Sequence, residues 1–242
     1  DLATIIYTSG TTGMPKGVML THNNLQASAK DWIDLNAAHI PENAVDLHWL
    51  PLSHAFGTGA IMLGNVLGWQ SYFANPNNVM SKFQQVQPHI FLSVPAYWEK
   101  LYLQIQAEGG NKPAFEKVTG GSLTFGLSGG AGLKKEIKEG FQQMGLLIIE
   151  GYGLTECSPT LTMNRFDQYN FDSVGVVYPS VELKLANDGE ILARGPNVFS
   201  GYYKNDKATQ EAFTPDGWFK TGDVGQWLEG DFLKIIDRKK EI

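Results

Sequence analysis

The chain has almost no cysteine and no long apolar run. Among its 242 residues there is one cysteine, Cys157, so an internal disulfide is excluded and a lone thiol offers no metal-ligand spacing. Such cysteine usage is typical of a reducing compartment, and we expect a cytoplasmic protein. No apolar stretch is long enough to cross a bilayer, although contact with a membrane surface stays open.

Basic charge is also scarce. The chain has 19 Lys and Arg against 25 Asp and Glu, a formal net charge of −6, and no long basic run. We therefore expect no nucleic-acid partner. Hydrophobic residues make up 43% of the chain, which is enough for a sizeable core at this length. Composition indicates no oligomeric state.

Two sequence patterns divide the chain. Up to about residue 160, short apolar runs such as residues 90–94 alternate with amphipathic helices, one of them opened by Pro95. Later, residues 181–185 alternate strictly and residues 187–189 supply a hairpin turn. We therefore predict an α/β fold with a mostly parallel sheet flanked by helices, followed by a small antiparallel, barrel-like β subdomain.

The most informative segment is residues 7–17. It combines glycines, hydroxyls and Lys16 directly after an apolar strand. Glycine lets backbone N–H groups converge, hydroxyls add donors, and the lysine supplies a cation for a polyphosphate. It is not a P-loop, because Pro15 stands where that motif needs glycine. A flexible linker is the alternative, but strand and helix patterns flank the segment closely. The residues expected to bind phosphate are Thr8, Ser9, Gly10, Thr11, Thr12 and Gly13.

Five more motifs follow in order. They are LPLSHAFG at residues 50–57, SGGA at 128–131, YGLTE at 152–156, TGD at 221–223 and DR at 237–238. With residues 7–17, they resemble the adenylate-forming superfamily, which includes acyl-CoA synthetases, firefly luciferase and the adenylation domains of peptide synthetases. The resemblance implies that Mg·ATP activates a carboxylic acid as an acyl adenylate, whose acyl group then passes to a thiol.

Thr155 and Glu156 follow a strand and what we interpret as a Gly-Tyr-Gly turn, at the sheet edge where α/β proteins bind ligands. The resemblance implies that Thr155 contacts the α-phosphate and that Glu156 holds Mg²⁺. Tyr152, between Gly151 and Gly153, has ring faces suited to stacking on adenine. A helix start and a core aromatic are the ordinary alternatives for these residue types.

Small residues and a carboxylate complete the expected nucleotide site. Gly129, Gly130 and Ala131 would let a flat base approach the backbone, and the resemblance places adenine there, although a plain tight turn is the alternative. Asp223 is implied to bind the ribose hydroxyls with help from Arg238, although an aspartate after glycine is otherwise an ordinary turn residue.

The acid site is implied by the LPLSHAFG motif. A lone histidine such as His54 would ordinarily be a satisfied core residue, but the resemblance places it where the acyl chain meets the phosphates. Phe56, Gly57 and Ser128 would line the pocket. Residues 56–59 hold no aspartate, which favours a plain acid over an amino acid. The chain resembles long-chain fatty acyl-CoA synthetases more than amino-acid activators.

The resemblance also divides the chain. Residues 1–47 would be the end of a first α/β subdomain with the phosphate loop, 48–160 a second with the acyl and adenine sites, and 161–236 the β subdomain. Residues 237–242 would begin a hinge at Lys240 to a C-terminal domain that is missing here and that the resemblance implies is needed for activity. Because strand-like residues follow Asp1 at once and the chain stops in a charged stretch, we expect truncation at both ends and a nearly inactive fragment.

We therefore predict an AMP-forming ligase that uses ATP, Mg²⁺ and coenzyme A to activate a fatty acid. The expected catalytic residues are Lys16, His54, Thr155 and Glu156. Two alternatives stay open. One is an adenylation domain that loads another acid onto a carrier protein. The other is a module that binds ATP or AMP without turnover. The expected partners are small molecules, with peripheral membrane contact open for fatty substrates.

Overall fold

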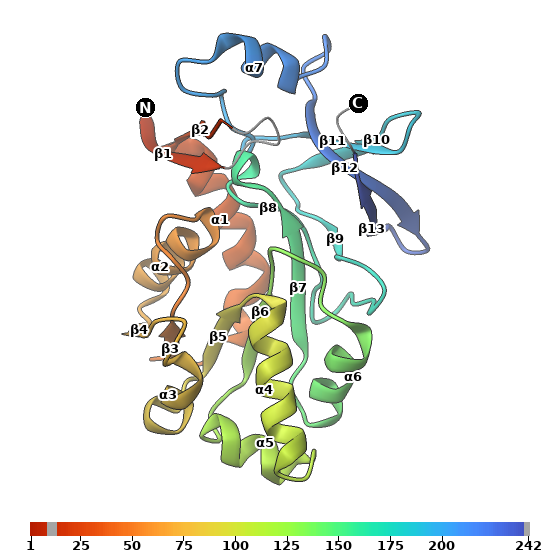
Figure 1. Ribbon diagram of the computed structural model, residues 1–242. Helices are drawn as coiled ribbons and strands as arrows, with labels where there is room; N and C mark the ends of the chain where they lie inside the picture. The colour runs from red at the N-terminus through yellow and green to blue at the C-terminus, as the bar shows by residue number, and fades with distance from the viewer. Residues whose placement is uncertain (9–13, 240–242) are drawn as a thin grey trace.

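The computed structural model describes residues 1–8 and 14–239, and it consists of an α/β body joined to a smaller β-rich region (Figure 1). Six of the residues singled out above lie outside the described part: Ser9, Gly10, Thr11, Thr12, Gly13 and Lys240. The predicted α/β fold followed by an antiparallel β subdomain is confirmed. No helix in the described part is both long and apolar enough to cross a membrane.

A seven-stranded sheet forms the centre of the body, in the order β4-β3-β5-β6-β7-β8-β9. The bounds are β3 (Val45–His48), β4 (Gln70–Phe73), β5 (Ile90–Ser93), β6 (Phe125–Ser128), β7 (Ile148–Gly153), β8 (Thr160–Met163) and β9 (Val176–Val177). Strands β3, β4, β5, β6 and β7 pair in parallel. Strand β8 pairs antiparallel with β7, and β9 pairs antiparallel with β8. The sheet thus continues past residue 160, where the sequence pattern changes; the subdomain limits stay a prediction.

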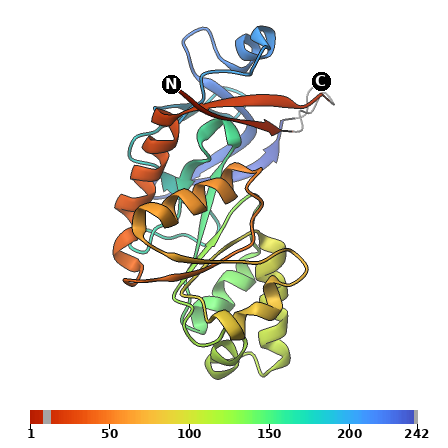
Figure 2. The same cartoon turned by 90° about the vertical axis from the view of Figure 1, so that its left-hand side faces the viewer.

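Helices cover both faces of this sheet (Figure 2). On one face lie α1 (His22–Asn36) and α2 (Ala55–Leu67); on the other lie α3 (Val79–Val86), α4 (Pro95–Ala107), α5 (Lys112–Thr119) and α6 (Lys135–Gln143). A short 3₁₀ helix, η1 (Ala37–His39), follows α1. Helix α4 begins at Pro95 as predicted, because proline needs no N–H partner in the first turn. Its buried face packs through Trp98 against Phe91 and Phe141.

The β-rich region contains a four-stranded antiparallel sheet in chain order. Its strands are β10 (Glu182–Leu185), β11 (Glu190–Arg194), β12 (Phe219–Leu228) and β13 (Phe232–Arg238), with α7 (Asp206–Ala212) beside them. The predicted hairpin joins β10 to β11, and Gly189 takes the left-handed conformation there, with φ 82°. Beneath α7, Phe199 packs against Phe213 and Phe219.

The helix pattern that flanks residues 7–17 does not begin directly after the segment, because β1 (Leu2–Thr8) first pairs with β2 (Lys16–Thr21) as an antiparallel hairpin. Val18 and Leu20 alternate into the core with no exposed surface, which suits a strand. Helix α1 starts only after Thr21, whose hydroxyl caps it. The predicted Gly-Tyr-Gly turn is wrong, because residues 151–153 belong to β7 and pair with β8.

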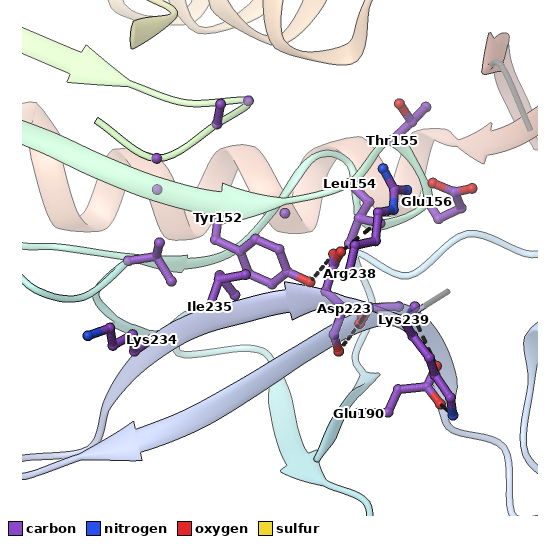
Figure 3. A pocket seen from close by; sticks show the side chains of 18 of the residues that line it. Tyr152, Leu154, Thr155, Glu156, Glu190, Asp223, Lys234, Ile235, Arg238 and Lys239 are labelled. Carbon is purple, nitrogen blue, oxygen red and sulfur yellow. Dashed lines mark hydrogen bonds and ion pairs between the residues drawn. The ribbon is translucent and has the colours of Figure 1, made fainter. Parts of the chain in front are cut away.

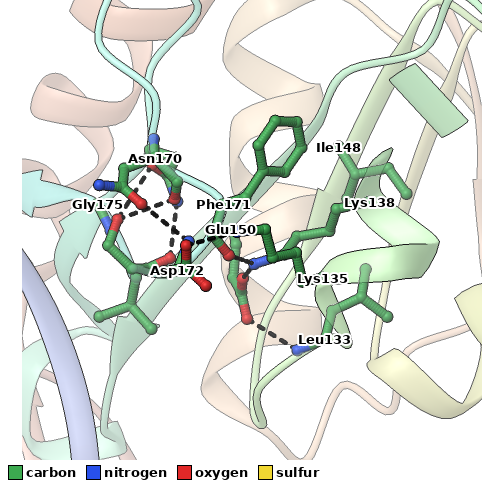
Figure 4. Close-up of polar contacts among 12 residues, drawn as sticks. Leu133, Lys135, Lys138, Ile148, Glu150, Asn170, Phe171, Asp172 and Gly175 are labelled. Carbon is green, nitrogen blue, oxygen red and sulfur yellow. Dashed lines mark hydrogen bonds and ion pairs between the residues drawn. The ribbon is translucent and has the colours of Figure 1, made fainter. Parts of the chain in front are cut away.

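A buried ion pair ties α6 to β7 (Figure 4). Lys138 donates to Glu150, and both side chains are only 3% exposed. The ammonium also donates to the carbonyl oxygen of Phe171 at 2.7 Å, while the other Glu150 oxygen accepts from the Leu133 N–H at 2.9 Å. Both charges are therefore paired and hydrogen-bonded, as burial requires.

Replacing Lys138 by Met should lower the free energy of unfolding by about 3 kcal/mol, because it leaves the Glu150 carboxylate buried without its cation. Urea denaturation measures this. Lys135→Met is the matched control, since Lys135 lies on the same helix but pairs with Asp172 at the surface; little change is expected. Equal losses in the two variants would contradict a special cost of breaking the buried pair.

Candidate functional site

A cavity of about 1120 Å³ opens between the carboxyl end of β7 and the β12–β13 hairpin (Figure 3). We call it the polar cavity. The predicted residues that line it are Thr8, Lys16, Gly130, Ala131, Gly151, Tyr152, Gly153, Thr155, Glu156, Asp223 and Arg238. Five motifs that are far apart in sequence therefore meet in one place, at the sheet edge where the sequence predicts ligand binding.

Tyr152 and Asp223, which both line this cavity, are in direct contact (Figure 3). The Tyr152 hydroxyl donates to Asp223 Oδ2 at 2.8 Å, and Arg238 Nε lies 3.8 Å from Oδ1. Burial and the nearby negative charge of Asp223 raise the pKa of Tyr152, so the phenol stays a donor. Sequence reasoning considered only the tyrosine ring and missed the role of its hydroxyl in fixing the carboxylate.

Asp223 is also held through the turn that precedes it. Gly222, with φ 74°, donates its N–H to Glu190 at 3.1 Å. The Lys239 ammonium donates to the other Glu190 oxygen at 2.8 Å, and the Lys239 N–H donates to the Gly222 carbonyl at 2.7 Å. Hydrogen bonds to Asp188 and Glu190 raise the pKa of Lys239, so this cation persists. We did not single out Glu190 or Lys239, because their contacts depend on strand pairing that local sequence does not reveal.

Thr155 and Glu156 lie in a short 3₁₀ helix, η2 (Thr155–Cys157), directly after β7. The loop before α7 fixes this turn. The Asn197 side-chain amide donates to the carbonyl oxygens of Cys157 at 3.0 Å and Thr160 at 2.8 Å, and the Phe199 N–H donates to that of Glu156 at 2.7 Å. Asn197 is fully buried, so it is a support that sequence reasoning missed.

Glu156 is the carboxylate expected to hold Mg²⁺. It lines the polar cavity, where Oε1 accepts from the Tyr202 hydroxyl at 2.8 Å. Across residues 1–8 and 14–239, no group of three or more His, Cys, Asp and Glu residues could hold a metal alone. A single carboxylate nevertheless suits Mg²⁺, which keeps several waters and takes further ligands from substrate phosphates. The residues present therefore fit a metal that arrives with a nucleotide.

A second cavity, of about 510 Å³, lies between α1, α2 and the sheet. We call it the apolar cavity. Its lining includes His54, Phe56 and Gly57, the residues expected in an acid pocket, together with Trp32 and Met62. Gly57 also allows close packing, because a Cβ there would lie 2.3 Å from the Pro51 carbonyl oxygen.

Two expectations about residues 128–131 need correction. Ser128, expected in the acid pocket, lines neither cavity and is fully buried. Side chains alternate along a strand, so Leu127 and Gly129 face the apolar cavity while Ser128 points to the opposite face. Gly129, expected at the nucleotide, lines the apolar cavity only, whereas Gly130 lines both.

The two cavities share one wall. The residues that line both are Gly130, Gly151, Tyr152, Gly153, Leu154 and Thr155. All but Gly130 belong to the carboxyl end of β7 and the residues directly after it. A molecule in the apolar cavity can therefore meet a molecule in the polar cavity beside Thr155.

The whole chain resembles curated ligases. A long-chain fatty-acid–CoA ligase of Mycobacterium bovis is 34% identical in an alignment 287 residues long, gaps included. The alignment covers 100% of this chain and 47% of that protein. A long-chain fatty-acid–CoA ligase of Escherichia coli O157:H7 is 33% identical over 260 residues, covering 100% and 45%. The chain thus spans about half the length of the curated relatives it matches.

Solved structures share the fold. A malonyl-CoA ligase with methylmalonyl-CoA and AMP bound superposes with a TM-score of 0.85 at 30% identity, covering 100% of this chain and 54% of that one. O-succinylbenzoate coenzyme A synthetase from Bacillus subtilis, in complex with AMP, gives 0.81 at 28% identity, covering 99% and 50%. The family model described as AMP-binding enzyme matches residues 1–203. This chain therefore belongs to the AMP-binding enzyme family.

Proposed function

We propose that this chain carries the nucleotide and acid sites of an AMP-forming ligase, which activates a fatty acid with ATP and transfers the acyl group to coenzyme A. The observation that carries the proposal is the shared wall at Thr155, where the polar and apolar cavities meet. Acyl-adenylate formation needs such a meeting, because the carboxylate of an apolar acid must reach the α-phosphorus of a nucleotide. The relatives named as long-chain fatty-acid–CoA ligases support both the acid and the acceptor.

In this proposal the polar cavity holds the nucleotide. Asp223 accepts hydrogen bonds from the ribose hydroxyls with Arg238 beside it, and the backbone at Gly130 and the ring of Tyr152 frame the base. Lys16 and Thr155 face the phosphates. When Mg²⁺ is bound with ATP, Glu156 holds it, and the ion offsets charge on the phosphate oxygens.

The chemical step follows from this placement. A carboxylate oxygen of the acid forms a bond to the α-phosphorus, and the bond from that phosphorus to the bridging oxygen of the β-phosphate breaks. Pyrophosphate leaves with the electron pair. Lys16 and Thr155 neutralise and orient the phosphates, while the apolar cavity aims the carboxylate past His54. The protein contributes mainly positioning and charge stabilisation, as in phosphoryl transfer generally.

The apolar cavity favours a hydrocarbon acid. Of the described residues that line it, none is Asp, Glu, Lys or Arg. A second carboxylate, as in malonate, or the ammonium of an amino acid would be buried there without an opposite charge, which is costly. The cavity therefore favours a fatty acid. The single, buried Cys157 suits a reducing compartment such as the cytoplasm.

Replacing Asp223 by Ala should weaken AMP binding by about tenfold or more, because hydrogen bonds to a charged acceptor are lost. Isothermal titration calorimetry with AMP measures this. Asp216→Ala is the control: it removes the same group from an exposed turn of the same region, 65% exposed, that does not line the cavity. Equal AMP affinities for both variants would contradict the ribose assignment.

Gly59 provides a test of the acid site. It lines the apolar cavity, and nothing lies within 4 Å of where its Cβ would stand. Leu at this position should fill cavity space without a clash, and it favours the helix more than glycine does. Gly59→Leu should weaken binding of a non-hydrolysable long-chain acyl-AMP analogue about tenfold and leave AMP binding unchanged.

Asn65→Leu is the matched control, because it adds the same side chain on the exposed face of α2. Calorimetry with analogues of graded chain length measures both variants. If Gly59→Leu bound the long-chain analogue as tightly as the parent chain does, the apolar cavity would not be the acyl site.

A further inference from the structure

Tyr202 lies between two charged residues of the polar cavity that come from separate elements. Its hydroxyl donates to Oε1 of Glu156, a residue of η2, at 2.8 Å. Its ring lies below the ammonium of Lys16 on β2, with Nζ 5.3 Å from the ring centroid. Tyr202 itself lines the cavity, although only 7% of its surface is exposed. One neutral side chain therefore contacts both a cation and a carboxylate.

The backbone holds Tyr202 in this position. It forms an antiparallel bridge with Val18, and the next residue, Tyr203, donates its N–H to the Gly17 carbonyl at 2.8 Å. The segment thus lies along the edge of the β1–β2 hairpin and is joined to it by an isolated bridge. On the other side, the Tyr202 N–H donates to the Thr209 hydroxyl on α7 at 2.9 Å. These contacts fix the backbone from which the ring reaches Lys16 and the hydroxyl reaches Glu156.

The chemistry of the phenol suits it to this place. Burial, followed by the negative charge of Glu156, raises the pKa of Tyr202, so its hydroxyl stays protonated and donates. The hydrogen bond occupies one carboxylate oxygen of Glu156 and leaves the other without this donor. A ring face attracts an ammonium at distances up to about 6 Å without neutralising it. Both charges therefore remain available to a ligand.

We propose that Tyr202 is a positioning residue that presents the second oxygen of Glu156, Oε2, to the metal ion of Mg·ATP and holds Lys16 beside the phosphates. The inference rests on the proposed function and extends it, because neither the motifs nor the relatives assign Tyr202 a role. A carboxylate fixed in advance loses less freedom when the ion binds, so the hydroxyl should strengthen binding only when the metal is present.

Tyr202→Phe tests this, because it removes the hydroxyl and keeps the ring below Lys16. Calorimetry should show Mg·ATP binding weakened about tenfold, the effect of losing a hydrogen bond to a charged group. Binding of AMP, and of ATP in the presence of EDTA, should stay within twofold of the parent chain. Tyr203→Phe removes the same hydroxyl from the neighbouring residue, which is 41% exposed, and should change none of these affinities.

Glu156→Gln separates this inference from the proposed function. If Glu156→Gln leaves the metal dependence of ATP binding unchanged, the assignment of Mg²⁺ to Glu156 fails. If it weakens that dependence and Tyr202→Phe does not, only the role of Tyr202 fails. The double variant should bind Mg·ATP no more weakly than Glu156→Gln alone. Loss of AMP binding in Tyr202→Phe would also overturn the inference, since it would indicate a general structural role.

Discussion

The close approach of Gly153 to Pro159 is the constraint on which the site depends. A Cβ at Gly153 would lie 1.8 Å from the Pro159 carbonyl oxygen, so only glycine allows β8 to return beside β7 at this point. The return folds Thr155 and Glu156 into a tight turn, in which Thr155 lines both cavities and Glu156 lines the polar one. The end of β7 therefore borders both cavities.

The carboxylates that line the polar cavity differ in the partners that hold them. Glu150, which precedes the shared wall on β7 and also lines the polar cavity, is paired with the Lys138 ammonium, which satisfies its charge within the fold. Asp223 and Glu156 each accept a hydrogen bond from a tyrosine hydroxyl, and the only cation paired with Asp223 among the described residues is the exposed Arg238, 3.8 Å away. A neutral donor orients a carboxylate without cancelling its charge. The difference separates a carboxylate that stabilises the fold from two that remain available to bind.

Local patterns predicted those elements whose signals are themselves local. Pro95 at a helix start and the turn at Gly189 specify their backbone directly. The strand after Lys16 and the extension of β7 through Gly153 were missed, because pairing with the adjacent strands β1 and β8 makes these segments extended and their own residue patterns do not reveal it. The motif residues of the candidate site could be named from sequence, but their supports could not. Tyr202 reaches Glu156 across 46 positions, a contact that no local pattern encodes.

The two cavities are lined largely by different elements, which has a consequence for how such proteins diversify. Helix α2 supplies much of the apolar cavity, whereas the β12–β13 hairpin borders only the polar one. A substitution at Gly59 can reshape the proposed acid site without touching the residues that line only the polar cavity. In the proposed ligase, the acid can therefore change in small steps while the proposed nucleotide site stays the same. Solved relatives named for malonyl-CoA and O-succinylbenzoate share this fold with a chain whose curated relatives are named for long-chain fatty acids.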